Sequence, residues 1–382
     1  MTKTQTRSDI DAFAAIADHR TGTPGDLAAS YLLLGACTAA GVTARLISWP
    51  FARRLIQTAR VQLADGTRIE GTPMFDSPDT PEGGISGQAG ALDAATTLGV
   101  ARFSSQEGHP LTQALQAARE ASVLKGIVAI GAADGIKPGI AVINAERYGN
   151  PFGPPVLQVA SEHASALESA PTLTLEIISR WRETTACNVD ALVQGRQPDL
   201  APVVVMTPKS GWWTCASERG GGIAAWLACL RHLAGSKPLR TVYFTANSGH
   251  ELGHIGMHHY LKAHRSRIRE AALWVHLGAN FAARDSQVIL QTSSQDLMRA
   301  MHDAFGRHGA PYHQSVPVGT RPLGEARDIF DGGGRYISIV ASNPWFHHPD
   351  DRPSISVDYD RADNTVQAFV ELVETAANQP AS

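Results

Sequence analysis

The segment spanning residues 241–260 limits the possible folds more than any other part of this 382-residue chain. It begins with β-forming residues at 242–245, passes through a polar turn at 247–249, and continues with apolar residues at roughly helical spacing. A strand that runs through glycine into a helix places its turn at the carboxyl end of a sheet, where α/β enzymes hold reactive side chains. Two imidazoles and a carboxylate at this junction indicate a metal site: His250, Glu251 and His254.

The same residues match a short zinc-protease pattern. His250-Glu251-Leu252-Gly253-His254 is an HExxH string. In proteases of the zincin type, both histidines lie on one face of a single helix and bind zinc, and the glutamate is the base. Here Gly249 and Gly253 disfavour a continuous helix. We keep the zincin interpretation as one alternative, with His250 and His254 as ligands.

Composition limits the classes of molecule that this protein is expected to bind and the cellular compartment in which it is expected. The net charge of −3 and the lack of a basic run exclude a typical nucleic-acid binder. No apolar stretch reaches the roughly 18 residues of a membrane span, and the N-terminus lacks the apolar core of a signal peptide. The four cysteines are scattered and read as reduced thiols, which predicts a cytoplasmic protein. A small-molecule or peptide substrate is expected, and a homo-oligomer stays open.

The order of elements predicts an α/β protein with an insertion. Residues 173–382 alternate strands and helices, which indicates a mostly parallel sheet with helices on both faces. Residues 61–172 are richer in glycine and proline and predict a smaller β-rich domain. We therefore expect one α/β domain formed by residues 1–60 and 173–382. Shorter strands are predicted at 126–131, 139–144, 173–179 and 187–195, with the last two paired.

The central segment resembles one family of zinc enzymes. These are the zinc aminopeptidases of the bacterial leucyl-aminopeptidase type, which include glutamate carboxypeptidase and the transferrin receptor ectodomain. Their segment reads roughly Gly-Glu-Glu-x-Gly-Leu-x-Gly-Ser, and residues 249–257 read Gly-His-Glu-Leu-Gly-His-Ile-Gly-Met. The opening of the chain, with Thr-Pro-Gly before an apolar helix, is also similar. The resemblance implies that residues 61–172 form a protease-associated-type domain.

The resemblance also implies a set of metal ligands, and several of them are altered. Five side chains bind two zinc ions in the family, and the matching positions are Thr207, Glu218, Glu251, His276 and His347. Threonine is a poor zinc ligand, and Lys209 beside it replaces a carboxylate. We therefore expect one divalent ion, with zinc the expected metal. Its predicted ligands are Glu218, Glu251 and His347, with His276 or His250 as a further ligand, and His348 replaces His347 if the alignment shifts by one.

His250 stands where the family has its general base. An imidazole with an unperturbed pKa of about 6.5 can take a proton from water, but His250 can equally bind the metal or only form a hydrogen bond. For the substrate, Arg219 and Arg327 are predicted to clamp a carboxylate or another anion. Trp213 and Trp345 are predicted to form an aromatic wall, against the alternative of ordinary core packing.

These expectations define a leading function and two alternatives. The leading hypothesis is a metal-dependent hydrolase of an amide or peptide C–N bond, either aminopeptidase-like or specialised for a small molecule, in which the metal activates water and His250 relays the proton. The first alternative is a non-catalytic protein that kept the fold, lost its metals and binds a ligand or partner. The second alternative is the HExxH zincin.

Overall fold

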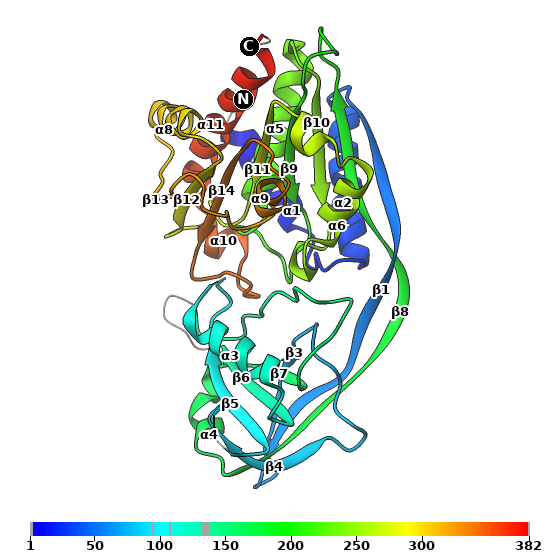
Figure 1. Cartoon of the computed structure of the whole chain (residues 1–382), viewed down its shortest axis with the longest axis vertical. Coiled ribbons are helices and arrows are strands. Elements are labelled where there is room, and N and C mark those ends of the chain that lie inside the picture. The colour runs from blue at the N-terminus through cyan, green and yellow to red at the C-terminus, as the bar shows by residue number, and fades with distance from the viewer. Residues whose placement is uncertain (1–2, 94, 107, 132–136, 381–382) are drawn as a thin grey trace.

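The protein consists of an α/β unit and a smaller lobe, joined by a long two-stranded ribbon (Figure 1). The computed structural model describes residues 3–93, 95–106, 108–131 and 137–380. Both described ends of the chain lie on the α/β unit, at the end far from the lobe (Figure 1). The chain therefore leaves this unit once, builds the lobe, and returns.

The centre of the α/β unit is a sheet with four parallel strands. Its order is β13-β12-β14-β11-β9-β10-β8-β1, with β8 at Thr172–Val193 and β1 at Thr43–Leu63. Strands β14, β11, β9 and β10 are parallel, β12 is parallel to β13 and antiparallel to β14, and β8 is antiparallel to both β10 and β1. The strand bounds are β9 Val203–Pro208, β10 Val242–Asn247, β11 Leu273–Leu277, β12 Gln287–Thr292, β13 Gln314–Ser315 and β14 Tyr336–Ser342. This confirms the predicted mostly parallel sheet.

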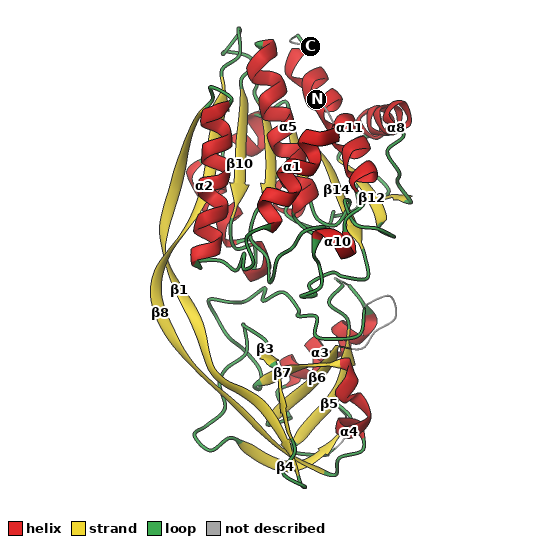
Figure 2. Ribbon diagram, turned by 180° about the vertical axis from the view of Figure 1, so that it is seen from behind, coloured by secondary structure: helices red, strands yellow, loops and turns green. Residues whose placement is uncertain are grey.

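Helices cover both faces of this sheet, as predicted (Figure 2). Successive side chains of a strand point to opposite faces, so Val203 and Val205 of β9 enter one core while Val204 and Met206 enter the other. The first core is covered by α1 Lys3–Ala14, α2 Pro24–Ala39, α5 Gly220–Ser236, α8 Gln295–His308 and α11 Tyr359–Asn378. The second is covered by α6 Ile255–Ala263, α7 Arg267–Glu270 and α9 Ala326–Asp331.

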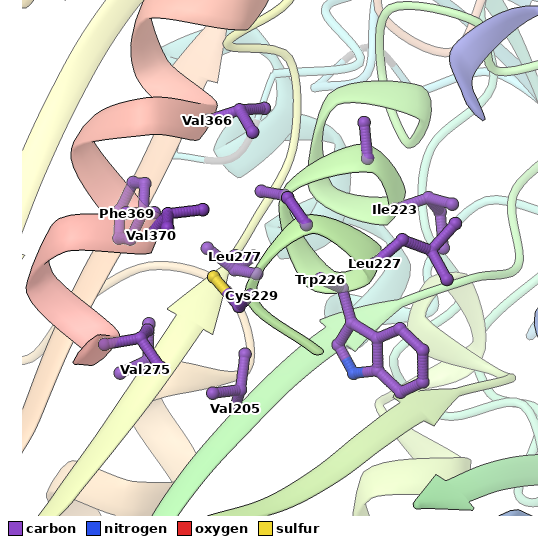
Figure 3. Close-up of a cluster of buried hydrophobic side chains, with 14 of the residues drawn as sticks. Val205, Ile223, Trp226, Leu227, Cys229, Val275, Leu277, Val366, Phe369 and Val370 are labelled. Atoms are coloured by element: carbon purple, nitrogen blue, oxygen red, sulfur yellow. The ribbon is translucent and has the colours of Figure 1, made fainter. Parts of the chain in front are cut away.

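The first core shows why the central strands are apolar along their whole length. Trp226 and Cys229 of α5 and Phe369 of α11 lie over Val205 and Val275 of the sheet (Figure 3). All five side chains are at most 1% exposed. A strand buried on both faces needs apolar residues at every position, which is the pattern that the sequence shows at residues 203–206.

The ribbon corrects one expectation from the sequence. Strand β1, Thr43–Leu63, pairs antiparallel with β8, Thr172–Val193, from Thr43 opposite Leu192 to Leu63 opposite Leu173, with one bulge near Ile56. The segments 173–179 and 187–195, predicted as two strands paired with each other, belong almost entirely to the single strand β8. Each of them pairs with β1 instead, because the intervening residues continue the ladder.

The lobe continues the sheet from the far end of the ribbon. Its strands are β2 Arg68–Glu70, β3 Thr72–Pro73, β4 Ile85–Gly90, β5 Leu98–Phe103, β6 Gly126–Gly131 and β7 Val156–Ala160. Its helices are α3 Pro110–Ala121 and α4 Ala164–Glu168, with a 3-10 turn at Ser161–His163. The strand predicted at 126–131 is confirmed. The strand predicted at 139–144 is wrong, because this apolar stretch is an irregular segment that packs toward the α/β unit.

The carboxyl ends of the parallel strands point toward the lobe. Strand β8 runs from the lobe into the α/β unit, and β10 is antiparallel to it, so β10 and its parallel neighbours run back toward the lobe (Figure 2). Any site at these strand ends therefore has the lobe as its opposite wall. No helix in the described part of the chain is long and apolar enough to cross a membrane.

Candidate active site

The predicted site residues gather at the strand ends that face the lobe. Residues 209–219 follow β9, residues 248–254 follow β10, His276 lies near the end of β11, and residues 343–351 follow β14. The carboxyl ends of parallel strands meet at one edge, which brings these segments together. A cavity of about 670 Å³ opens there, and its lining includes His250, His276, Asn280, Arg327 and Phe346 of the α/β unit and one side of α3 of the lobe.

The segment after β10 is not one helix. Gly249 and Gly253 have left-handed backbones with φ of 76° and 81°, and between them lies the 3-10 turn His250–Leu252. His254 also has a positive φ, 57°, and α6 begins after it. The zincin alternative requires both histidines on one helix, so this alternative is wrong. The two imidazoles instead stack with ring centroids 4.8 Å apart, and His254 Nδ1 lies 2.8 Å from an Asp328 carboxylate oxygen.

Glu251 is bound by two hydroxyl groups. Thr21 Oγ1 donates to its Oε1 at 2.8 Å, and Ser210 Oγ donates to its Oε2 at 2.6 Å. The side chain is buried, and burial raises the pKa of this carboxyl group. Both oxygens of the predicted metal ligand therefore have protein partners in this structure.

Glu218 and His347 are brought together, as the resemblance implied. His347 Nε2 lies 3.4 Å from Glu218 Oε1, and the same oxygen lies 2.8 Å from Arg219 Nη2. Burial alone raises the pKa of Glu218, but the charges of Arg219 and His347 outweigh it and lower this pKa to about 2. His347 Nδ1 must donate to the Val142 carbonyl oxygen, 2.7 Å away, because a carbonyl only accepts. This leaves Nε2 on the side of Glu218.

Arg219 is a buried cation at the centre of this group. Its side chain is 1% exposed, and its Nε donates to the Ser210 carbonyl oxygen at 2.7 Å. Burial lowers the pKa of His250 well below its usual range, and the charge of Arg219 lowers it further. Arg219 was predicted as a substrate clamp, but it does not line the cavity and lies against Glu218 instead.

Lys209 and Thr207 have purely internal partners. Lys209 Nζ lies 2.5 Å from Asp26 Oδ1 and 2.6 Å from Ser248 Oγ, and it is fully buried. Thr207 Oγ1 donates to the Leu277 carbonyl oxygen at 2.8 Å. Thr207, which matches a ligand position of the second zinc, thus has a structural hydrogen bond, and the neighbouring Lys209 is an ammonium group paired with a carboxylate. Asp26 was not foreseen, because Thr-Pro-Gly-Asp reads as an ordinary helix start.

His250 and His276 line the cavity and each has one partner through Nδ1. His250 Nδ1 lies 3.4 Å from Oε1 of Glu325, a fully buried carboxylate that sequence reasoning also missed. Burial raises the pKa of Glu325. His276 Nδ1 lies 2.8 Å from Ser338 Oγ, and burial lowers the pKa of His276 to about 3. Both imidazoles are therefore neutral near pH 7.

The remaining predicted substrate residues are divided between the cavity and the packing around it. Arg327 lines the cavity and pairs with Glu146 at 2.6 Å. Trp213 Nε1 donates to the His347 carbonyl oxygen at 2.9 Å, and Trp345 is buried beneath Lys137. Neither tryptophan is among the described residues that line the cavity. His348, the fallback for His347, has its Nε2 against the Pro138 carbonyl oxygen at 3.1 Å.

The donor set does not fit a resident zinc with three protein ligands. Within residues 3–93, 95–106, 108–131 and 137–380, no group of three or more His, Cys, Asp or Glu side chains is arranged to hold a metal ion. Glu218 and His347 offer two donors, and Glu251 and His276 have other partners. A catalytic zinc normally has three protein ligands.

Comparison with solved structures identifies the fold. The chain is similar to a zinc aminopeptidase from Bacillus subtilis, with a TM-score of 0.80 and 16% identity over 100% of this chain and 96% of that chain. It is also similar to a peptidase M28 precursor from Shewanella amazonensis, with a TM-score of 0.81 and 15% identity over 99% and 94% of the two chains. A third similar structure is an aminopeptidase from Aneurinibacillus, with a TM-score of 0.73 and 14% identity over 100% of this chain and 97% of that chain.

These similarities cover nearly the full length of each partner, so they include the lobe as well as the α/β unit. No protein-family model matches the sequence, and no curated protein sequence matches it. The chain therefore has the fold of the zinc aminopeptidases. At identities of 14–16% this similarity concerns the fold, and the function has to be argued from the site.

Proposed function

We propose that this protein hydrolyses an amide or a related C–N bond in a small molecule bound in the 670 Å³ cavity, with His250 as the general base. The observation that carries the proposal is the pairing of a cavity-lining imidazole with a buried carboxylate, His250 Nδ1 with Glu325 Oε1 at 3.4 Å. A base whose far nitrogen is held by a carboxylate is the arrangement that orients imidazoles in hydrolases.

The residues have the following roles in this proposal. The Glu325 carboxyl group accepts a hydrogen bond from Nδ1–H of His250 and fixes the tautomer in which Nε2 can accept a proton. His250 takes a proton from the attacking water as the oxygen adds to the carbonyl carbon. The same imidazolium then gives this proton to the leaving nitrogen as the C–N bond breaks. Burial lowers the pKa of His250, and the charge of Arg219, which is paired with Glu218 outside the cavity lining, lowers it further and so helps to keep this imidazole neutral before it accepts the proton.

A metal-dependent form of this hydrolase, with one divalent ion on Glu218, Glu251 and His347, is the other version of the proposal. It requires the Glu251 carboxylate to leave the hydroxyl groups of Thr21 and Ser210. One observation favours a bound cation: among the described residues, neither of the Glu218 oxygens nor His347 Nε2 makes a hydrogen bond of normal geometry, although Glu218 Oε1 forms an ion pair with Arg219. An ion there would act as a Lewis acid for the carbonyl group.

The test is metal content and turnover in one set of variants. Protein purified without chelator or histidine tag should contain clearly less than one metal per chain and should hydrolyse a member of a small-amide library in the presence of chelator. His250→Gln should lower kcat by about 10²–10⁴-fold, the usual contribution of a general base. His258→Gln is the matched control, because His258 is exposed on α6 and does not line the cavity.

Two results would redirect this proposal. One metal per chain, lost in Glu251→Ala together with activity, would establish the metal-dependent form. Unchanged turnover in His250→Gln would remove the imidazole from its role as base.

A non-catalytic binding protein is the second candidate. The observation that favours it is the buried Lys209–Asp26 pair, a structural contact made by the residue that replaces a carboxylate beside Thr207. This candidate predicts that wild-type protein binds small molecules in the cavity, detected by ligand-observed NMR, without converting any of them. It also predicts that His250→Gln changes affinity only.

A further inference from the structure

A chain of hydrogen bonds fixes the proton position on His276. The Leu323 backbone N–H donates to Gln291 Oε1 at 2.7 Å, which orients this amide. Gln291 Nε2 then donates to Ser338 Oγ at 3.1 Å, and Ser338 Oγ lies 2.8 Å from His276 Nδ1. Among the described residues, His276 Nδ1 is the acceptor that lies beside the Ser338 hydroxyl group, and a buried hydroxyl proton without an acceptor is costly, so we take this proton to point at His276 Nδ1. The neutral imidazole therefore carries its own proton on Nε2.

This Nε2–H group has no partner in the described part of the chain. His276 Nε2 is buried and makes no hydrogen bond, and an unsatisfied buried donor is costly unless something pairs with it. The ring itself lines the cavity. An acceptor supplied by a ligand would satisfy this donor.

Two glycines keep the ring edge within reach of the cavity. A Cβ atom on Gly324 would lie 2.8 Å from His276 Cε1 and 3.6 Å from Nε2, and one on Gly278 would lie 2.8 Å from Cε1. Both glycines line the cavity. A side chain at either position would cover the ring edge, so the backbone leaves a passage to the Nε2 side.

The apolar side chain of Val340 lies beside the ring edge of His276, since a Cβ atom on Gly278 or Gly324 would meet both, while the lining as a whole also includes the charged residues Glu120, Glu146 and Arg327. Other lining residues of the α/β unit include Ile289, Leu323 and Phe346, with the amide of Asn280. Arg327 of the lining is paired with Glu146. A neutral N–H donor beside an apolar side chain suits the carbonyl oxygen of an acyl group better than a charged carboxylate, because no cation of the described residues lies next to the donor to offset the cost of burying the charge.

We propose that His276 is a substrate-binding residue whose Nε2–H donates to the carbonyl oxygen of an uncharged, apolar acyl group, with Ser338 and Gln291 as positioning residues. This inference rests on the proposed use of the cavity, and it assigns the part of the substrate that His276 recognises. It also replaces the predicted metal-ligand role, because a protonated Nε2 has no lone pair for a metal.

The first test is the tautomer of His276 in the ligand-free protein, measured by long-range ¹H–¹⁵N NMR of the imidazole rings. We expect the Nε2–H form in the wild type. Gln291→Glu should invert it, because a carboxylate accepts the Ser338 proton and leaves Ser338 to accept from His276 Nδ1–H. Gln287→Glu is the matched control, because Gln287 is the exposed first residue of the same strand. An Nδ1–H form in the wild type overturns the proposal, and this measurement does not depend on whether any variant folds.

The second test uses two neutral probes that differ in one carbonyl group, acetanilide and N-ethylaniline. Acetanilide should bind at least about tenfold more tightly and shift the His276 Nε2 resonance, because only it can accept the buried donor. Gly324→Ala should abolish this preference. Equal binding of both probes, or binding of neither, overturns the carbonyl assignment. Neither readout requires turnover, so loss of the hydrolase proposal would be seen separately as absent activity.

Discussion

Lys209 and Asp26 form a buried ion pair. Removing one of the two charges should destabilise the protein strongly, whereas removing both should cost much less. In Lys209→Met, the Asp26 carboxylate stays buried without its cation, so the free energy of unfolding should fall by about 3–5 kcal/mol. The double change Lys209→Met with Asp26→Asn should recover much of this loss, because neither buried charge remains. Urea unfolding followed by circular dichroism measures both.

Lys3→Met supplies the control for this pair. Lys3 contacts Asp360 with both side chains largely exposed, so its loss should leave the urea midpoint unchanged. If Lys209→Met were as stable as the wild type, the buried ammonium would be dispensable for folding.

His258 should make stability depend on pH. A hydrogen bond to Asp328, at 3.2 Å, raises the pKa of His258 above its usual value of 6.5. Other groups near this imidazole are Glu325 and Arg327. The imidazolium contact is fully present below pH 6.5 and is lost as pH rises through the raised pKa. His258→Gln should therefore lower the melting temperature at pH 5.5 and leave it nearly unchanged at pH 9.

The pH effect of this histidine should be small, because His258 is partly exposed and exposed pairs contribute at most about 1 kcal/mol. His302→Gln, on α8 and bound to the Ser315 hydroxyl group, is a comparison without an ionic partner. Equal losses at the two pH values in His258→Gln would show that the Asp328 contact is not ionic.

At the scale of residues, the sequence predicted which side chains belong to the site better than it predicted which of them contact one another. Glu218 and His347 were predicted to meet, and they do. Lys209 was noticed as unusual, but its partner Asp26 lies 183 residues away, and no local pattern connects them. Such pairings depend on how distant strands and helices dock, which a single sequence does not encode in its periodicity.

The turn between β10 and α6 depends on glycine. Gly253 has φ 81°, and a Cβ atom there would lie 2.6 Å from the Glu146 carbonyl oxygen. Gly253→Ala should therefore destabilise the protein by at least about 1–3 kcal/mol, through backbone strain and through the clash with the segment that connects to the lobe. Thermal unfolding gives the comparison.

Gly306→Ala is the matched substitution in a regular helix. Gly306 lies within α8 with nothing near its Cβ direction, so alanine should stabilise by up to about 1 kcal/mol. A harmless Gly253→Ala would mean that the turn can adopt another backbone conformation.

At the scale of elements, the sequence predicted the α/β unit because each of its strands is an apolar run between turn residues. The centre of β8 was missed for a physical reason. Residues 180–186 are mostly charged or polar and largely exposed, since this part of the ribbon has solvent on its faces. What keeps it extended is the ladder to β1, a long-range partner. For residues 139–144 the error is the opposite one. This apolar stretch was predicted as a strand, but it is buried as an irregular segment that pairs with no strand.

Arg54 of β1 binds the loop at residues 74–79 of the lobe and the neighbouring strand β8 through its guanidinium group. Its guanidinium donates to the carbonyl oxygens of Met74 and Ser77, to Ser179 Oγ on β8, and to Asp79 at 2.5 Å. Arg54→Met should lower the free energy of unfolding by on the order of 3 kcal/mol. Hydrogen exchange should rise in residues 74–80 and change little in α5 and α11, because these helices have their own core.

Arg60→Met tests whether any arginine on β1 would do the same. Arg60 pairs with Glu176 at the ribbon surface, partly exposed, and should affect exchange far less. Equal effects of the two substitutions would assign the result to the strand and not to the anchored loop.

For the whole molecule, the change in composition near residue 61 is the sequence signal behind the predicted division into an α/β domain and an inserted part, and that division stays a prediction. The predicted boundaries at 60/61 and 172/173 fall at the far ends of β1 and β8, which extend from one part into the other. The cavity was not predictable, because its lining comes from both parts, and only the docking of the lobe against the strand ends creates it.

The ribbon also determines how such a molecule can be taken apart and rebuilt. Its outgoing and returning strands are paired along their length except at the bulge near Ile56, and Trp49 lies opposite Ala186 close to the α/β unit. A tight turn grafted between these two positions would excise the lobe as a cassette and leave an ordinary hairpin at the sheet edge. Lobes of other lengths or shapes can be exchanged at the same splice point without rethreading the sheet, so the far wall of the cavity is the part of the molecule most open to redesign.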